Sequence, residues 1–231
     1  MRVFAIGDLH MPGGMDKPMG VFGAHWDDHI TQISKAWLES ITSEDIVLIP
    51  GDLSWAMHLD DAIKDLQIIH ELPGTKLILR GNHDYWWTSI SKLRSKIPSS
   101  FIALQNDSVK IGEFCFTGTR GWLCPGSASY TESTDGKIYR RELMRLELSL
   151  GKASDELRKI CMLHFPPFSE SNKTTGFTNL MEQYGVEQAV YAHLHGKSCV
   201  NTFNGMLNGV NYTLCSCDCI GFVPKLICES N

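Results

Sequence analysis

Leu77-Ile78-Leu79-Arg80-Gly81-Asn82-His83-Asp84 joins a short apolar run to three side chains that can bind metal or move protons. The apolar residues 77–79 predict a buried strand, and Gly81 predicts its end. An amide oxygen binds hard cations, an imidazole binds metal or shuttles protons, and a carboxylate does either. A polar loop after a strand is common, so the meaning of this stretch depends on the side chains at the ends of the other strands.

Other apolar runs end in side chains of the same kinds. Such runs predict strands at residues 2–6, 46–49, 160–163 and 189–192. The polar side chains that come after these runs are Asp8 and His10, Asp52, His164, and His193 and His195. Five of the nine histidines in the chain therefore lie at strand ends, which is difficult to assign to chance.

Amphipathic helices are predicted between the strands of the first half. Ile30, Ile33 and Trp37 recur at spacings of three and four, which predicts a helix that begins at Asp27 or Asp28. Further helices are predicted at residues 59–72, 90–97 and 138–150. Buried strands that alternate with such helices are typical of a sheet covered on both faces, and ligands gather at the carboxyl edge of such sheets.

The second half of the chain is richer in strands. Extended segments are predicted at residues 101–104, 109–111, 114–116 and 212–217, and Asn208-Gly209 predicts a hairpin turn. No internal repeat and no linker-like stretch interrupts the sequence. We therefore expect residues 1–231 to form a single domain.

Composition and charge exclude several classes of protein. The chain is 43% hydrophobic and 20% charged, which suffices for a large core and argues against disorder. A net charge of -5 argues against a nucleic-acid partner or an anionic membrane. No apolar run approaches the ~20 residues of a membrane span. The N-terminal residues lead directly into a strand without the pattern of a signal peptide, so we expect a cytoplasmic location.

Eight cysteines occur in the sequence. Cys215, Cys217 and Cys219 alternate with other residues, which suits one face of a strand rather than a zinc site of the Cys-x-x-Cys kind. Cytosolic proteins seldom carry disulfides. We therefore expect reduced and mostly buried thiols.

The strand-end side chains together predict a cage for two divalent cations. Mixed imidazole and oxygen ligands suit Mn, Fe, Zn or Ni better than Ca or Mg. Two such ions roughly 3.5–4 Å apart polarise a phosphoryl oxygen and activate a water for in-line attack. Alternation along an extended chain would turn both side chains of Asp8-x-His10, and both of His193-x-His195, toward one site.

The order of these motifs resembles that of the calcineurin-like metallophosphoesterase superfamily. The motifs are Asp-x-His, Gly-Asp, Gly-Asn-His-Asp, a single His and His-x-His, and they extend from Asp8 to His195. The resemblance implies a four-layer α/β/β/α sandwich with a dinuclear metal site above the carboxyl ends of the central strands. It also implies hydrolysis of a phosphomonoester or phosphodiester through attack by a metal-bridging hydroxide.

The resemblance assigns a role to each residue that matches a motif. Asp52 would bridge both metals, His83 would be the acid that protonates the leaving group, and Asp84 would orient His83. The other ligands would be Asp8, His10 and His195 for one metal and Asn82, His164 and His193 for the second. Ala192 stands where the family commonly has Gly, and Ala does not freely take a positive φ, so we expect this loop to differ.

Residues around the cage give weaker indications of the substrate. Trp86 and Trp87 would either wall a substrate pocket or pack inward, and the loop of residues 11–26 could fold over the site. Arg120 and the pair Arg140-Arg141 are candidate phosphate contacts, because a guanidinium matches phosphate geometry. These features favour a small phosphoester as the substrate.

Two alternatives stand beside a metal-dependent phosphoesterase. A nuclease of the same superfamily is one, although the acidic charge and the lack of a basic stripe argue against it. A non-catalytic metal-binding scaffold is the other, although this chain retains every ligand and His83. The sequence leaves the physiological substrate, the native metal and the oligomeric state open.

Overall fold

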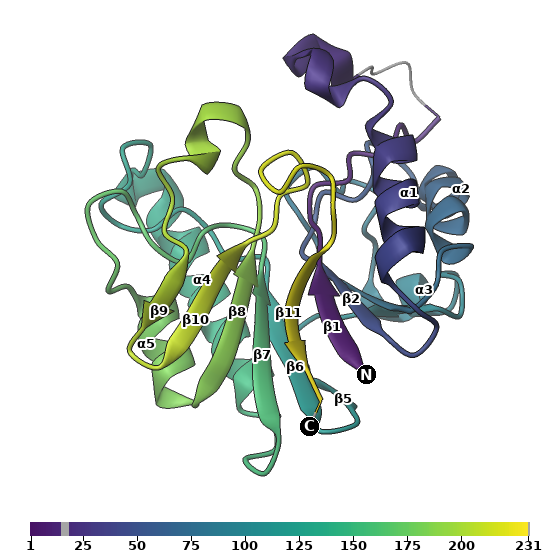
Figure 1. Cartoon of the computed structure of the whole chain (residues 1–231). Helices are drawn as coiled ribbons and strands as arrows, with labels where there is room; N and C mark the ends of the chain where they lie inside the picture. The colour runs from purple at the N-terminus through teal and green to yellow at the C-terminus, as the bar shows by residue number, and fades with distance from the viewer. Residues whose placement is uncertain (15–18, 231) are drawn as a thin grey trace.

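The computed structural model describes residues 1–14 and 19–230, and within these residues the strands form two sheets. The sheets lie side by side in the middle of the molecule, with α1, α2 and α3 outside one of them and α4 and α5 outside the other (Figure 1). The predicted four-layer α/β/β/α sandwich is therefore confirmed.

The first sheet has the strand order β11-β1-β2-β3-β4. Four of these strands run parallel, and β11 lies antiparallel against β1 at one edge. The strands span Arg2–Ala5 (β1), Ile46–Ile49 (β2), Thr75–Ile78 (β3), Phe101–Ala103 (β4) and Lys225–Glu229 (β11). The helices that cover this sheet span His29–Ser40 (α1), Leu59–His70 (α2) and Ile90–Arg94 (α3).

The second sheet has the order β5-β6-β7-β8-β10-β9. Its four central strands run parallel, and β5 and β9 are antiparallel edges. The strands span Val109–Ile111 (β5), Phe114–Thr119 (β6), Arg158–Leu163 (β7), Val186–Tyr191 (β8), Gly205–Leu207 (β9) and Val210–Leu214 (β10). The helices on this side span Glu132–Leu150 (α4) and Gly176–Gln183 (α5), and short 3₁₀ turns span Met19–Phe22 (η1), Ala24–Trp26 (η2) and Gly196–Cys199 (η3).

Alternate residues of β1 enter different layers of the core. Val3 and Ala5 lie in the cluster between the two sheets, together with Phe116 of β6. Phe4 belongs to the outer cluster that includes Trp37 of α1. Because strand side chains alternate, a strand that is buried on both faces needs apolar residues at every position, as the sequence of β2 has.

Several elements differ from their prediction in extent. Helix α4 begins at Glu132, six residues before the predicted start. The prediction missed the first turns because they are polar and contain Gly136. The hairpin at Asn208-Gly209 is confirmed, and both residues take positive φ angles, of 49° and 84°. Strands β9 and β11 and helix α5 were not predicted. No helix among residues 1–14 and 19–230 is long and apolar enough to cross a membrane.

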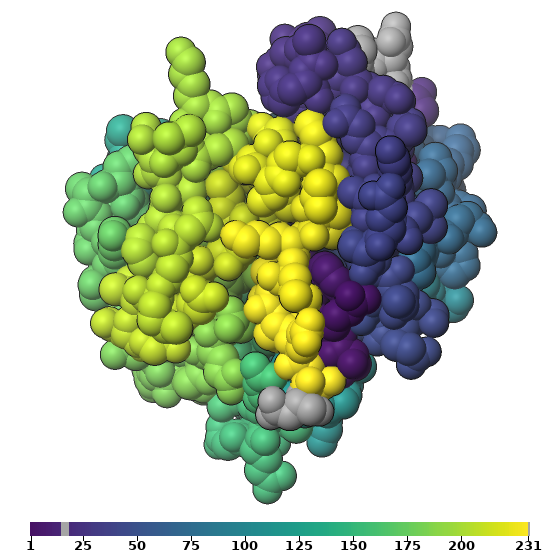
Figure 2. Space-filling model, in the orientation of Figure 1, coloured from purple at the N-terminus to yellow at the C-terminus, as the bar shows by residue number. Residues whose placement is uncertain are grey.

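The C-terminal segment, yellow in Figure 2, fills the face of the molecule between the N-terminal half and the green half. It brings Cys219 to Cys199 of η3, and the two form a disulfide with their Cα atoms 5.4 Å apart. The expectation that the cysteines are reduced is wrong for this pair. The two residues come together only in the folded chain, and the sequence alone does not show that they are neighbours. The other cysteines are free thiols, and Cys228 is the one that is not fully buried.

Candidate metal centre

The predicted strand-end side chains converge at the carboxyl edge of both sheets. The loops after β1, β2, β3, β7 and β8 all supply side chains to this edge, and η1, η2 and η3 lie above it (Figure 1). Two groups of three side chains each bring their ligand atoms within 4.8 Å of one another. The first group is Asp8, His10 and His195, and the second is Asp52, His164 and His193.

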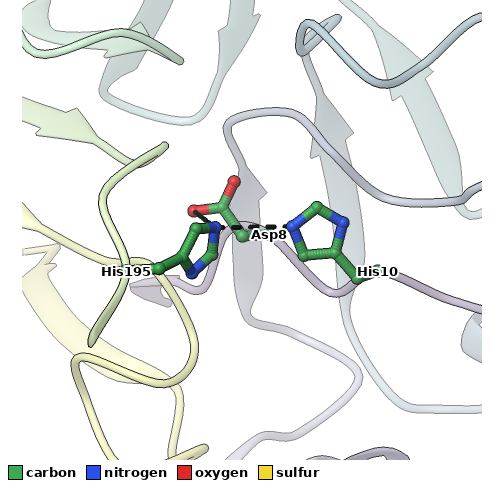
Figure 3. Close-up of side chains that lie close together, drawn as sticks. All are labelled: Asp8, His10 and His195. Carbon is green, nitrogen blue, oxygen red and sulfur yellow. Dashed lines mark hydrogen bonds and ion pairs between the residues drawn. The ribbon is translucent and has the colours of Figure 1, made fainter. Parts of the chain in front are cut away.

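The first group joins the loops after β1 and β8, which are far apart in sequence. Figure 3 shows the His10 and His195 rings and the Asp8 carboxylate turned toward one another. The Nε2 atoms of the two rings are 3.4 Å apart, and His195 Nε2 is 3.9 Å from Asp8 Oδ2. Nitrogen lone pairs and a carboxylate that face a common point suit a cation between them.

The second group centres on the His164 ring. Its Nδ1 lies 3.0 Å from the Pro50 carbonyl oxygen, which can only accept, so Nδ1 carries the proton of the neutral ring. The bare Nε2 then faces Asn82 Oδ1 at 2.6 Å and Asp52 Oδ2 at 3.5 Å. His193 Nδ1 is 3.2 Å from the same Nε2. Imidazole nitrogens, a carboxylate oxygen and an amide oxygen that crowd around one point fit a metal ion.

Burial sets the protonation of these side chains. It lowers the pKa of His164 and of His193 to about 3, and it lowers the pKa of His10 well below its ordinary value. Burial raises the pKa of Asp8 to about 7 and also raises that of Asp52. Neutral imidazoles are the form that binds metal, and a nearby cation would stabilise both buried carboxylates.

Unsatisfied polar atoms give a second test of the fit. Within the described part of the chain, Asp8 Oδ1 and His10 Nδ1 are buried without a hydrogen-bond partner. A buried polar atom without a partner costs about 1–3 kcal/mol, so each one in a folded protein calls for an explanation. A divalent cation held by Asp8 would supply the missing partner of the carboxylate, so the first group fits a metal.

A cavity of about 370 Å³ opens onto both groups and is called the site cavity below. Its floor includes His10, Asp52, His193 and His195, and its walls include Met19, Phe22, His25, Trp26 and Trp55. The His83 side chain also lines it, with its ring 6.0 Å from that of His10. The histidine predicted to donate a proton and two candidate metal sites therefore share one space.

A sequence model of the calcineurin-like phosphoesterase family matches residues 1–197. The chain belongs to the calcineurin-like phosphoesterase family. A comparison with curated proteins found no match. Family membership supports a phosphoesterase-type function for the chain. Members of this family generally bind two divalent metals.

Three solved structures share the calcineurin-like phosphoesterase fold of this chain. A protein of unknown function from Aquifex aeolicus is 15% identical with a TM-score of 0.51, and the match covers 97% of this chain and 95% of that one. The phosphopantetheinyl hydrolase of Mycobacterium tuberculosis is 14% identical with a TM-score of 0.54, covering 91% and 87%. A purple acid phosphatase from yellow lupin seeds is 17% identical with a TM-score of 0.52, covering 100% of this chain and 46% of that one.

The backbone that carries the candidate ligands is not extended. Asp8, His10, Asp52 and His193 have φ angles of 55°, 45°, 50° and 73°. The strand alternation expected within Asp8-x-His10 is therefore wrong, and tight left-handed turns aim the side chains instead. Such conformations cost of order 1–3 kcal/mol each and cluster at functional sites. Ala192 has no positive φ, and the left-handed position of this loop falls on His193.

Asp84 ties the loops after β2 and β3 together. Its carboxylate accepts the backbone N–H groups of Gly81, Asp52 and Leu53 at 2.7, 2.9 and 3.0 Å. It also accepts the indole N–H of Trp86 at 3.0 Å. These bonds fix the loops after β2 and β3, so they support a role for Asp84 in holding the loops that carry Asp52 and His83. That Asp84 also orients the His83 ring stays a prediction. Burial, and then the charge of Asp52, raises the pKa of Asp84 to about 7.

The tryptophans at the site are not the predicted pair. Trp86 is 1% exposed, and both it and Trp87 belong to the core cluster under the helices of the first sheet. Of the two alternatives left open for this pair, inward packing holds for Trp86, whose indole N–H donates to the buried Asp84 carboxylate. Trp87 lines a second cavity together with Arg120, and neither tryptophan lines the site cavity. Trp55 takes this place and stacks on His10, with ring centroids 4.7 Å apart and planes 18° apart.

Residues 19–26 of the predicted covering loop do lie at the site. Trp26 packs edge-on against His10, with ring centroids 6.2 Å apart, and Met19 lines the same cavity. Residues 15–18 of the loop lie outside the described residues. Trp55 follows Asp52 by three positions in the sequence, which was the available signal for its place beside the ligands.

Asp218 is a site residue that the sequence analysis missed. Its Oδ1 lies 2.9 Å from His195 Nδ1, and its Oδ2 accepts the N–H of Gly196 at 2.9 Å. Burial alone would lower the pKa of His195, but the Asp218 hydrogen bond and the Asp8 charge raise it. The bond fixes His195 Nε2 toward the first group. Asp218 directly follows a predicted strand, so the strand-end rule that found the other ligands also applied to it.

The candidate arginines lie beside the site rather than in it. Arg120 and Arg141 line the second cavity, which also includes Arg80 of the loop after β3. Arg140 is 63% exposed and pairs with Glu132 at 2.6 Å, so the structure removes it from the candidates.

Proposed function

We propose that this calcineurin-like phosphoesterase hydrolyses a small phosphomonoester or phosphodiester with the help of two divalent metals. The observation that carries the proposal is the pair of ligand groups that share the site cavity with His83. Asp8, His10 and His195 would hold one metal, and Asn82, His164 and His193 would hold the other, with Asp52 between them. When bound, the two cations supply positive charge to the phosphoryl group and activate water at neutral pH.

His83 is the residue we assign to proton transfer. Its backbone N–H donates to Asp52 Oδ1 at 2.8 Å, so the ligand loop fixes its position. Its ring lies 4.6 Å from the Trp55 ring and lines the cavity, so it can approach the oxygen of a departing group. A positioned histidine that protonates this oxygen contributes typically about 10²–10⁴-fold to the rate.

The walls of the site cavity support a small organic substrate. Trp26, Trp55 and Met19 rise beside the ligands, and aromatic rings stack on planar groups. The net charge of -5 supplies no long-range attraction for nucleic acids. The nitrogen-rich ligand set favours Mn, Fe, Zn or Ni over Mg or Ca. A single domain and a cytoplasmic location stay predictions.

Metal analysis of the purified protein, followed by a panel of substrates, tests the proposal. The panel contains aryl phosphate monoesters, aryl phosphate diesters, cyclic nucleotides and duplex DNA. We expect about two metals per chain and hydrolysis of small esters that a chelator abolishes. Cleavage of DNA in preference to small esters would favour a nuclease. Full metal content without any hydrolysis would favour a non-catalytic scaffold.

A further inference from the structure

A second cavity, of about 270 Å³, is lined by four arginines and is called the arginine cavity below. It lies where the loops after β3, β4 and β6 meet the middle of α4. The arginines are Arg80, Arg120, Arg141 and Arg145, and the one acidic residue of the lining is Glu142. A guanidinium is always charged in proteins, so four cations face one carboxylate.

Glu142 cannot neutralise this cavity. Its carboxylate is fully buried and lies 2.7 Å from Arg145, whereas its distances to Arg120 and Arg141 are both 3.8 Å. Its other oxygen accepts the Thr119 hydroxyl at 2.6 Å. One negative charge is thus shared among three guanidinium groups, and a net charge of +3 remains with Arg80 included.

Two of the guanidinium groups have unused donors. Within the described residues, Arg80 Nε and Arg120 Nε are buried without a hydrogen-bond partner. Arg120 is also held in place, because its guanidinium lies over the Trp122 ring at 4.7 Å. Fixed, planar donors that lack an acceptor are preorganised for an anion with several oxygens, such as a phosphate group.

The arginine cavity adjoins the second ligand group. Arg80 precedes Asn82 by two residues in the same loop. The Arg120 carbonyl oxygen accepts the N–H groups of His164 and Phe165 at 3.1 and 2.9 Å. Arg80 is therefore joined to the candidate ligand Asn82 through the chain, and Arg120 to His164 through a backbone hydrogen bond.

We propose that the arginine cavity binds a second anionic group of the phosphate class, so that the substrate is a phosphoester carrying a further phosphate. The binding of the anion follows from the cavity alone, whereas its assignment to the substrate rests on the function proposed above. One phosphate would lie at the metals while the other fills the arginine cavity.

Binding of inorganic phosphate to the chelator-treated, metal-free protein tests the anion site without any turnover. We expect Arg80→Gln and Arg141→Gln each to weaken phosphate binding about tenfold or more, because each removes a charged donor. Arg140→Gln is the matched control, since Arg140 neighbours Arg141 on α4 but faces solvent. Thermal unfolding of each variant verifies that it folds. Phosphate binding that is absent, or equal in all four proteins, would overturn the proposal.

A series of alkanediol bisphosphates, compared with alkyl monophosphates of equal length, tests the assignment to the substrate. We expect the metal-loaded enzyme to prefer a bisphosphate of one length by about tenfold or more in kcat/KM, and Arg80→Gln or Arg141→Gln to remove this preference. Arginine-dependent phosphate binding without any such preference would make the ligand a free anion and overturn the assignment. Arginine-dependent binding in a protein that hydrolyses no ester would defeat the phosphoesterase proposal and leave the anion site standing.

Discussion

The two ligand groups of the candidate metal centre are held in different ways. His164 of the second group is 0% exposed, and its ring is fixed by the Pro50 carbonyl inside the core. His195 of the first group has a side chain that is 35% exposed, and it is held by Asp218. His164 is therefore fixed by the packed core, whereas His195 stands on a loop that borders the site cavity and depends on Asp218 for its position. This difference predicts that the two metals respond unequally to mutation and to pH.

Removal of the shared ligand should abolish the distinction between the groups. Asp52→Asn is expected to reduce metal content at both groups and to lower kcat by more than about 10⁴-fold, because several kcal/mol of charge stabilisation from each cation is lost. Elemental analysis and single-turnover rates measure both effects. Asp60→Asn, at an exposed carboxylate paired with Lys96, is the control. Normal metal content in Asp52→Asn would show that Asp52 is not shared.

Loss of His83 should leave both metals in place. His83→Ala is expected to lower kcat about 10²–10⁴-fold for an alkyl phosphate, because the leaving oxygen then departs without a proton. The loss should be smaller for a nitrophenyl ester, whose leaving group needs little protonation. An equal loss for both esters, or a loss of metal, would contradict the assignment of His83 to proton transfer.

Asp218 should affect the first group alone. Asp218→Asn keeps the shape of the side chain but removes its charge, so His195 is held less firmly and is a weaker ligand. We expect metal affinity to fall about 10–100-fold at one of the two sites, which titration with a chromophoric chelator can resolve. Equal weakening at both sites would show that the two groups are not independent.

The pH dependence of metal affinity should differ between the two groups, by less than the effects of the mutations above. His164 and His193, with a pKa of about 3, are already neutral at pH 6 and release no proton to a metal. Asp8, with a pKa raised to about 7, and His195, whose pKa is also raised, hold protons that a metal must displace as the pH falls below 7. The pKa of Asp52 is raised too, but Asp52 would be shared by both metals and so does not separate the groups. Affinity at the first group should then fall about tenfold more per pH unit than at the second. Metal analysis after dialysis at pH 7 and pH 5.5 checks this order of loss.

The candidate ligands were predictable because each one follows its strand within a few residues. Asp8, Asp52 and His164 were found from local sequence alone, and the family resemblance divided them between the two metals. Asp218 also follows a predicted strand, so its place at this edge was predictable and was overlooked. Its bond to His195, 23 positions away, was not predictable, because the two come close only when β8 and β10 pair. The same dependence on tertiary pairing hid the Cys199–Cys219 bridge.

Side-chain direction and edge strands were the less predictable parts. Trp86 turns inward because the buried Asp84 carboxylate accepts its indole N–H, a contact that the run Tyr85-Trp86-Trp87 does not reveal. Strand β11 carries exposed and half-buried residues without a clear alternation, so only its pairing with β1 makes it a strand. The local pattern thus predicts which strands end at the site, but not which aromatic rings face it.

An anomalous-scattering map from crystals of the protein grown with manganese tests the central claim most directly. We predict two peaks roughly 3.5–4 Å apart, as in other two-metal sites. One peak should lie against Asp8, His10 and His195 and the other against Asn82, His164 and His193, with Asp52 between them. A single peak, no peak, or a peak away from these side chains would contradict the account.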